Sequence, residues 1–352
     1  MTELGRLIAA RIARTGPMTV ADYMADCLLH PDHGYYTTRP PFGAGGDFVT
    51  APEISQMFGE MIGLCLAQSW LDQGAPSSFV LAEPGPGRGT LMADILRATK
   101  AVPGFHAAMR LYLIEASPVL RTEQATRLPQ ATWVDTIGDL PDLPLWLVAN
   151  EFLDALPIRQ FVRAGAGWRE KVVRVNNDRL AFALTPAAPL AQLVDRLEDT
   201  SDGDLVEYCP ALPGIVGTIG EKIATRGGAA LFIDYGDWRS LGDTLQAVRA
   251  HGSTDPLAEP GLADLTAHVD FEAVALAAAP ARYSRLTSQG VFLERLGITA
   301  RAQSLAGQLS GAALDTHIAA HRRLTHPAEM GDLFKVIGLY PNGAPPPPGL
   351  EP

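Results

Sequence analysis

The sequence predicts an α/β fold built on a doubly wound parallel sheet. From residue 79 onward, short apolar runs that end in polar residues alternate with amphipathic helical patterns, which is typical of strands joined by crossover helices. The first run, Phe79 to Ala82, is apolar throughout, as expected for a strand buried on both faces. A glycine-rich turn follows it directly, and then a helix with one apolar stripe.

The turn has the pattern Glu83-x-Gly85-x-Gly87-x-Gly89. Glycines at alternate positions permit positive φ and let a ligand approach the backbone, while the start of the helix presents unpaired N–H groups. A dinucleotide fingerprint requires G-x-G-x-x-G/A, but Thr90 stands three residues after Gly87. Glu83 also puts a carboxylate beside the turn, which disfavours a pyrophosphate. The acidic-x-Gly-x-Gly form resembles that of methyltransferases, whose ligand carries an amino group and a sulfonium. This resemblance implies S-adenosylmethionine, with a tight connector as the alternative.

A second strand over residues 110–114 ends at Glu115. In a doubly wound sheet, an acid at this place accepts hydrogen bonds from both ribose hydroxyls. The alternative is that Glu115 only caps the following helix. We favour the ribose role, because the crevice of such a sheet opens at this end of the strands.

Two further strands end in candidate site residues. Residues 131–134 precede Asp135, a candidate for contact with adenine, although acids are common in surface loops. The fourth strand precedes Asn150 and Glu151, and Asp154 follows three residues later. If this segment turns helically, Glu151 and Asp154 point to one side, where a substrate pocket would lie. Alternatively, Asn150 is an N-cap and the two acids only favour a first helical turn.

Composition excludes several classes of protein. A chain of 352 residues predicts one large domain with insertions, or two domains. Its three cysteines match no metal or disulfide spacing, so we expect no metal and a reduced cytoplasmic setting. No apolar run is long enough to span a membrane, so we expect no stable membrane insertion. The net charge of −11 argues against a general nucleic-acid binder.

Residues 1–72 are expected to form helices around a long loop. Apolar spacing predicts an amphipathic helix that begins near Leu4. The stretch 30–49 is rich in Gly and Pro, and loops of this length are functional or disordered, so a cofactor-covering role is compatible with it. Thr50 and Glu53 are predicted to form a capping box for the apolar helix that follows.

The sequence pattern over residues 158–184 differs from that of the parallel strands before it. Three runs with partial alternation are separated by turn signals at 164–167 and 176–178, which predicts an antiparallel β insertion. The parallel sheet resumes over 229–235 and ends in Asp234-Tyr235. Tyr235 then either contacts the substrate or is a buried core tyrosine.

The last third of the chain is less regular. His268 is a candidate base or substrate-orienting residue, although an isolated histidine more often caps or packs. Residues 242–265 look like a second long loop, and 291–323 look helical. Residues 334–340 are predicted to be the last strand, antiparallel at the sheet edge. The tail 341–352 is proline-rich and expected to be disordered.

Five stretches of the sequence, taken in order, carry a family resemblance. They are His33-Gly-Tyr-Tyr, residues 46–59, residues 83–94, Asn150-Glu-Phe-Leu-Asp-Ala-Leu-Pro157 and Asp234-Tyr-Gly236. Residues 262–271, 289–293 and 330–335 agree with them. Together these stretches resemble one methyltransferase family, the MidA type, whose relatives include the mitochondrial complex I assembly-factor protein arginine methyltransferase.

The resemblance implies a class I (Rossmann-like) methyltransferase fold, with a seven-stranded sheet, a helical N-terminal extension, and β and helical insertions. On this basis we divide the chain into segments. These are 1–72, N-terminal helices and cofactor-covering loop; 73–157 and 227–340, the cofactor-binding core; 158–226, a β-hairpin and helical insertion; 242–325, a loop and helical substrate-side lobe within the core; and 341–352, the tail.

The resemblance also implies S-adenosylmethionine as the cofactor and an arginine of a complex I core subunit as the substrate. The expected partners are thus a protein substrate and, as an open alternative, a second copy of the chain; the expected setting is the cytoplasm of a bacterium or the mitochondrial matrix of a eukaryote. The candidate catalytic residues are Glu151, Asn150, Asp154, Tyr235 and His268. The candidate cofactor-binding residues are Glu83, Gly85, Gly87, Gly89, Glu115, Ala116, Asp135, Asn150, Thr50 and Pro52.

Three other functions remain open on the sequence. A methyltransferase for a small molecule would close its pocket, whereas one for a protein would have an open acidic groove. An assembly factor that binds cofactor and partner with little catalysis would tolerate loss of Glu151. A dinucleotide oxidoreductase is disfavoured by the spacing of the glycine turn.

Overall fold

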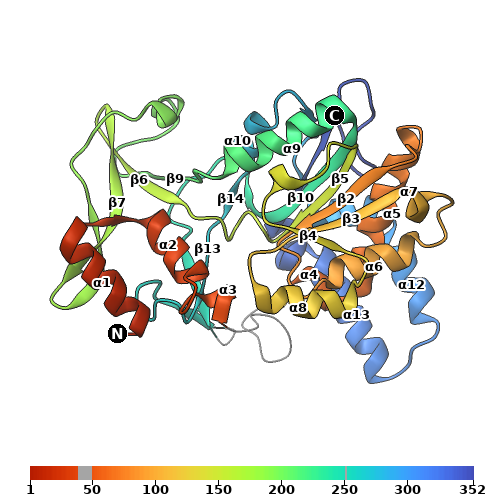
Figure 1. The fold of residues 1–352 in the computed structure, drawn as a ribbon, viewed down its shortest axis with the longest axis horizontal. Helices are drawn as coiled ribbons and strands as arrows, with labels where there is room; N and C mark the ends of the chain where they lie inside the picture. The colour runs from red at the N-terminus through yellow and green to blue at the C-terminus, as the bar shows by residue number, and fades with distance from the viewer. Residues whose placement is uncertain (39–49, 250–251) are drawn as a thin grey trace. The chain divides into compact units, whose positions relative to one another are not determined.

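The computed structural model describes residues 1–38, 50–249 and 252–352. The chain forms two compact units (Figure 1). We call the first the accessory unit; it comprises Met1–Phe48, Asp154–Leu212 and Arg239–Asp270. We call the second the core unit; it comprises Val49–Leu153, Pro213–Trp238 and Phe271–Pro352.

The core unit contains a mixed sheet with a parallel centre. Its strand order is β15-β17-β10-β5-β2-β3-β4, with β16 beside β17. Neighbours from β10 to β4 are parallel, and β17 is antiparallel to β10. These strands are β2 (Phe79–Pro84), β3 (Met109–Ile114), β4 (Thr132–Val134), β5 (Leu145–Asn150), β10 (Gly228–Asp237), β15 (Arg282–Tyr283), β16 (Thr287–Ser288) and β17 (Phe334–Tyr340).

This sheet confirms the predicted α/β fold and its parallel core. The order reverses between β5 and β2, so a switch point lies at the carboxyl ends of these two strands. One prediction about the sheet is wrong, since β17 is not its edge: Arg282 and Tyr283 pair with the outer side of β17. A strand of two residues has too few positions to show an alternating pattern, which is why the sequence did not indicate β15.

The helices of the core unit pack on this sheet. Helices α5 and α6 lie so close that a Cβ on Gly63 would come 3.0 Å from the Cα of Ile95. The predicted capping box is wrong, because the Thr50 side chain makes no capping bond and Ser55 accepts from the N–H of Met57 instead. These helices are α4 (Ala51–Ile54), α5 (Gln56–Asp72), α6 (Thr90–Thr99), α7 (Phe105–Ala108), α8 (Pro118–Arg127), α9 (Leu212–Arg226), α10 (Phe271–Ala277), α11 (Gln289–Arg295), α12 (Ile298–Ala306) and α13 (Ala312–Thr325).

The tail after β17 is ordered rather than disordered as predicted. Leu350 is buried in the hydrophobic core, and the carbonyl of Pro348 accepts a bond from Cys65 Sγ. The N–H of Arg285 donates to the carbonyl of Glu351 at 2.8 Å. Prolines keep the tail extended, but these contacts tie it to the core unit.

The accessory unit combines N-terminal helices with a twisted antiparallel sheet of order β1-β7-β6-β9, with β8 beside β7. The predicted β insertion is confirmed, including its second turn, where Asn177 and Asp178 have φ of 48° and 57°, as a two-residue hairpin turn requires. The elements are α1 (Glu3–Thr15), β1 (Met18–Thr19), α2 (Val20–Leu29), α3 (Tyr35–Thr38), β6 (Arg159–Ala164), β7 (Gly167–Asn176), β8 (Arg179–Leu184) and β9 (Leu205–Tyr208).

Residues 242–265 are not one long loop. They contain β11 (Gln246–Arg249), β12 (Gly252–Thr254) and most of β13 (Asp264–Thr266), which form a separate three-stranded sheet. Strands of three or four residues between Gly, Asp and Pro show no clear period, so the sequence pattern was read as irregular. The short strand β14 (Val269–Asp270) follows.

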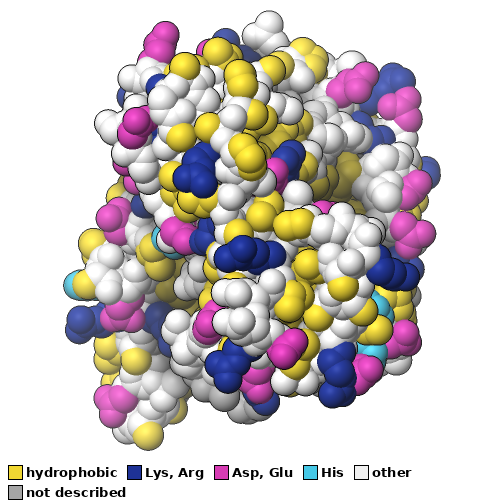
Figure 2. All heavy atoms as spheres, turned by 90° about the vertical axis from the view of Figure 1, so that its left-hand side faces the viewer, with side chains coloured by type: hydrophobic (Ala, Val, Ile, Leu, Met, Phe, Trp, Pro, Cys, Tyr) yellow, Lys and Arg dark blue, Asp and Glu magenta, His cyan; other side chains and the backbone are white. Residues whose placement is uncertain are grey.

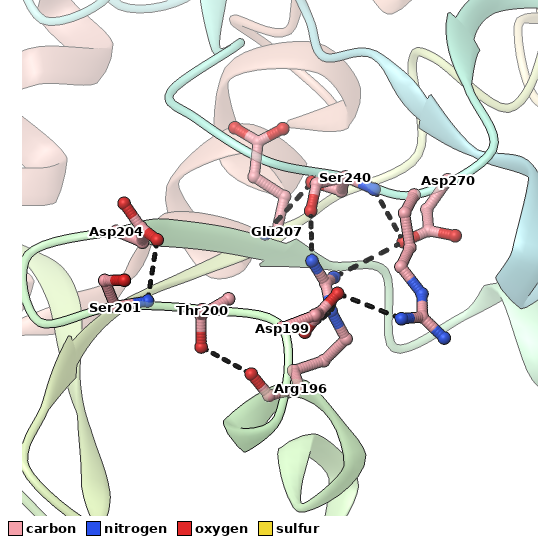
Figure 3. Close-up of polar contacts among 9 residues, drawn as sticks. Arg196, Asp199, Thr200, Ser201, Asp204, Glu207, Ser240 and Asp270 are labelled. Carbon is pink, nitrogen blue, oxygen red and sulfur yellow. Dashed lines mark hydrogen bonds and ion pairs between the residues drawn. The ribbon is translucent and has the colours of Figure 1, made fainter.

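The accessory unit has two 3₁₀ turns, Ala191–Leu193 and Asp195–Leu197, and a polar network ties the second of them to the segment Arg239–Asp270 (Figure 3). Arg196 is almost fully buried; its Nε donates to Asp199 at 3.0 Å and its Nη2 to the Ser240 carbonyl at 2.7 Å. Ser240 N–H in turn donates to Asp270 at 3.0 Å. A buried guanidinium is stable only when its donors are used in this way.

The surface drawn in Figure 2 carries basic and acidic side chains interspersed among hydrophobic ones. Its described side chains therefore do not form the continuous positive surface that nucleic-acid binding uses. Within the described ranges, no helix is long and apolar enough to cross a membrane.

Candidate functional site

The glycine turn between β2 and α6 requires its glycines. Gly85, Gly87 and Gly89 have φ of 61°, 52° and 75°, a region that other residues rarely adopt. A Cβ on Gly85 would come 2.9 Å from Cδ2 of Phe152, and a Cβ on Gly89 would come 3.0 Å from Cδ1 of Leu128. The conformation of the turn therefore depends on its positive φ angles and on close packing against Phe152 and Leu128.

A polar clamp holds this turn from both sides. Arg88 Nε donates to Glu123 on α8 at 2.6 Å, and Arg88 Nη1 lies 3.6 Å from Glu53 on α4. Thr90 donates its hydroxyl proton to Glu53 Oε1 at 2.5 Å. Glu53, which the sequence assigned to a capping box, thus stabilises the turn instead. The sequence spacing carried no signal for this contact, because Glu53 and Thr90 are far apart along the chain.

Glu83, at the end of β2, has a buried carboxyl group. It is 3% exposed, and its Oε2 has no hydrogen-bond partner among the described residues. Burial, and secondly the neighbouring Glu115, raise the pKa of Glu83 to about 8. An acid in this state stabilises a cationic or hydrogen-bond-donating ligand group placed beside it. The α-ammonium group of S-adenosylmethionine is such a group.

Glu115 follows β3 and is 8% exposed. Its Oε1 accepts the N–H of Ser117 at 2.8 Å, and its Oε2 accepts Nε2 of Gln124 at 3.1 Å. Burial raises the pKa of Glu115, and these bonds oppose that rise. The alternative that Glu115 caps α8 is wrong, because Ser117 is the N-cap and accepts the N–H of Leu120.

The segment after β5 turns away from helical geometry at Glu151, whose φ is 50°. Its Oε1 accepts the N–H of Ala51 at 3.0 Å and Nδ2 of Asn150 at 3.1 Å. The condition of a helical turn is not met, since residues 152–156 form no helix. The Oδ2 of buried Asp234 accepts the N–H groups of Phe152 at 3.2 Å and of Leu153 at 3.0 Å. A non-glycine residue held at positive φ is a common mark of a functional site.

The core unit thus brings together Glu83, the glycine turn, Glu115 and Asn150-Glu151 at the carboxyl ends of β2, β3 and β5. Pro52 is buried at the start of α4, and Thr50 directly precedes that helix. Ala116 is exposed beside Glu115. Asp135 is also exposed, and it pairs with Arg121 at 2.7 Å.

The other three candidates have different surroundings. Tyr235 is in the core unit, 7% exposed, and packs edge-to-face on Phe334 with 5.4 Å between ring centroids. Asp154 and His268 belong to the accessory unit. The Asp154 carbonyl accepts the N–H of Ala267 at 3.0 Å, and His268 N–H donates to Thr244 Oγ1 at 2.8 Å. The part of the expected cofactor-covering loop at 39–49 lies outside the described residues.

The residue that sequence analysis missed is Gln124, a fully buried amide on α8 that contacts both Glu115 and Gly87. Asp234 was noted only as a neighbour of Tyr235. Both act through bonds to residues distant in the chain, which a single sequence does not reveal.

The strand order and the glycine turn define a class I methyltransferase fold. The family model described as "Putative S-adenosyl-L-methionine-dependent methyltransferase" matches residues 61–288. The chain belongs to this family, and its cofactor is S-adenosylmethionine.

Relatives of the chain extend over nearly its whole length. It is 33% identical to the human "Protein arginine methyltransferase NDUFAF7, mitochondrial", covering 97% of this chain and 84% of that protein. The zebrafish (Danio rerio) protein of the same name is 36% identical, over 94% and 85% respectively. A solved structure of a likely methyl transferase from Burkholderia thailandensis, bound to S-adenosyl-homocysteine, is 31% identical with a TM-score of 0.81, covering 96% of this chain and 91% of that one.

Proposed function

We propose that this chain is a protein arginine N-methyltransferase that uses S-adenosylmethionine and acts on a subunit of respiratory complex I. The names of the relatives support the arginine substrate, and the family resemblance implies the complex I subunit. The observation that carries the proposal is Glu151, a carboxylate held at positive φ at the end of β5, beside the glycine turn of β2.

The residues of the core unit fit the cofactor. We assign the ammonium group to Glu83, whose Oε2 is buried without a partner among the described residues. The two ribose hydroxyls go to Glu115, and the close backbone approach to Gly85, Gly87 and Gly89. Asn150 contributes a buried Oδ1 that also lacks a partner within the described part of the chain.

The cofactor supplies an electrophilic methyl group on a sulfonium sulfur. A guanidinium is protonated at neutral pH and offers planar N–H donors, so the chain must bind and orient it with a carboxylate. Glu151 performs this role: the Ala51 N–H and Asn150 Nδ2 fix its Oε1. In this proposal the carboxylate of Glu151 binds the guanidinium and accepts the proton that the nitrogen loses. Asp154, three residues later in the chain, remains a candidate catalytic carboxylate.

The test uses labelled methyl groups. The purified chain is incubated with S-[methyl-³H]adenosylmethionine and a lysate from cells that lack the protein, and the labelled products are identified by mass spectrometry. Methylarginine in a complex I subunit is the expected result. Label confined to small molecules would overturn the proposal and favour the small-molecule enzyme, and no transfer despite tight cofactor binding would favour an assembly factor.

A further inference from the structure

Gln124 connects three parts of the core unit through one side chain. Its Nε2 donates to the carbonyl of Gly87 at 2.7 Å and to Oε2 of Glu115 at 3.1 Å. Its Oε1 accepts Nε1 of Trp133, on β4, at 2.8 Å. The glycine turn, the end of β3 and β4 therefore meet at a single amide that is 0% exposed.

The orientation of this amide is fixed by its partners. Gly87 and Glu115 present only acceptors to it, and Trp133 presents only a donor, so the reversed amide would oppose like groups at all three contacts. Both protons of Nε2 are used, and no rotation of the side chain would keep all three bonds. Gln124 is thus a rigid spacer between the carbonyl of Gly87 and the carboxylate of Glu115.

The bond to Gln124 also selects which lone pairs of Glu115 remain. A carboxylate oxygen has two lone pairs; Ser117 N–H takes one on Oε1, and Gln124 takes one on Oε2. The backbone N–H of Ala116 also bonds this carboxylate, so donors of the chain fix its orientation and the remaining acceptor capacity is directed to a ligand hydroxyl. Packing adds to this, since a Cβ on Gly89 would come 3.7 Å from Cγ of Gln124.

We propose that Gln124 is a positioning residue for cofactor recognition, which orients Glu115 toward the ribose hydroxyls and holds the glycine turn at the matching distance. The proposal rests on the proposed ribose role of Glu115. It makes the discrimination between ribose and deoxyribose cofactors a property of Gln124 as well as of Glu115.

The experiment measures binding of S-adenosylhomocysteine and of its 2′,3′-dideoxy analogue by calorimetry. The informative quantity is the dissociation constant of the dideoxy analogue divided by that of S-adenosylhomocysteine. A general loss of stability would not change this ratio. In Gln124→Leu this ratio is expected to fall about tenfold, toward one, because Glu115 loses its orientation. Gln124→Glu is expected to recover tighter binding of S-adenosylhomocysteine as the pH falls, since a protonated Glu at this position again donates to Glu115.

Two further variants keep the result interpretable if Gln124→Leu does not fold. Trp133→Phe removes only the donor that fixes the amide, and it is expected to lower the same ratio by a smaller factor. Gln160→Leu is the matched control: Gln160 is also 0% exposed, and its Nε2 donates to Glu207 at 2.7 Å in the accessory unit. Its ratio should equal that of the wild type.

An unchanged ratio in Gln124→Leu or, where that variant does not fold, in Trp133→Phe would overturn the role of Gln124. The variant Glu115→Gln distinguishes the ribose role of Glu115 from the positioning role of Gln124. If Glu115→Gln also leaves the ratio unchanged, the ribose role of Glu115 fails; if it lowers the ratio and the Gln124 variants do not, only the positioning role of Gln124 fails.

Discussion

Glu151 combines an unusual backbone conformation with a carboxylate that is held in place by hydrogen bonds. It adopts a φ of 50° while its carboxylate is tied to the Ala51 N–H. In Glu151→Gln the amide oxygen still accepts that bond, so the fold is retained, but the charge that binds a guanidinium is lost. We expect kcat for the methylated substrate to fall by about 10²-fold or more, while the dissociation constant for S-adenosylhomocysteine changes by less than about threefold.

The control for this prediction is Glu60→Gln in the same unit. Glu60 is equally a buried carboxylate, but its partners are Arg97 and Arg301. It should lower the melting temperature and leave kcat of the folded protein unchanged. A Glu151→Gln enzyme with wild-type kcat would show that the carboxylate is structural.

The pKa of Glu83, raised to about 8, makes a prediction about stability. Because this pKa lies above that of Glu in an unfolded chain, the folded state binds the proton more tightly and is stabilised by it. This stabilisation is complete at pH values below the unfolded pKa. It is lost as the pH rises from about 4.5 to about 8, by on the order of 1 kcal/mol per pH unit. The free energy of unfolding of the cofactor-free protein, from urea titrations at pH 5 to 8, should decrease over this range.

Glu83→Gln has no such proton to lose, so its free energy of unfolding should vary less with pH than that of the wild type. Saturating S-adenosylmethionine should likewise reduce the slope in the wild type, because the ammonium group stabilises the ionised carboxylate. Equal slopes for the variant and the wild type would assign the pH dependence to other groups.

At the scale of elements, the strand-to-helix turns determine the site. Gly85→Ala would place a Cβ 2.9 Å from Phe152, within the segment that carries Glu151. We expect binding of S-adenosylhomocysteine to weaken by at least about tenfold, together with a destabilisation of about 1–2 kcal/mol from the positive φ. Calorimetric titration and thermal unfolding measure the two effects separately.

Gly16→Ala is a suitable control, because Gly16 also has a positive φ of 86° but a Cβ there would meet nothing within 4 Å. It lies at the end of α1, in the accessory unit. A positive φ is then imposed on a side chain without the clash. If both variants bind the cofactor alike, close packing of the turn is not required.

The central elements could be predicted from sequence because their signals are local. The runs that became β2, β5 and β10 are mostly apolar, and the glycine turn is contained in seven consecutive residues. The segment after Asn150 could not be predicted, since its conformation depends on Asp234, a residue distant in the chain. Glu53 and Gln124 illustrate the same limit: their partners are set by tertiary contacts, so local spacing suggested a cap for the first and nothing for the second.

At the scale of the whole molecule, every proposed cofactor contact comes from the core unit. The glycine turn, Glu83, Glu115 and Asn150 lie on strand ends that the parallel sheet brings to one edge. Two further candidates, Asp154 and His268, belong to the accessory unit.

This division predicts where ligands protect the protein. S-adenosylhomocysteine at about 100 times its dissociation constant should stabilise the folded chain by about 2.7 kcal/mol, whereas NAD should leave the melting temperature unchanged. In hydrogen exchange, the slowed amides should lie in the core unit, at residues 83–89, 115–124 and 150–153. Slowed exchange that is confined to the accessory unit would contradict the assignment of the cofactor, and stabilisation by NAD instead would restore the dinucleotide hypothesis.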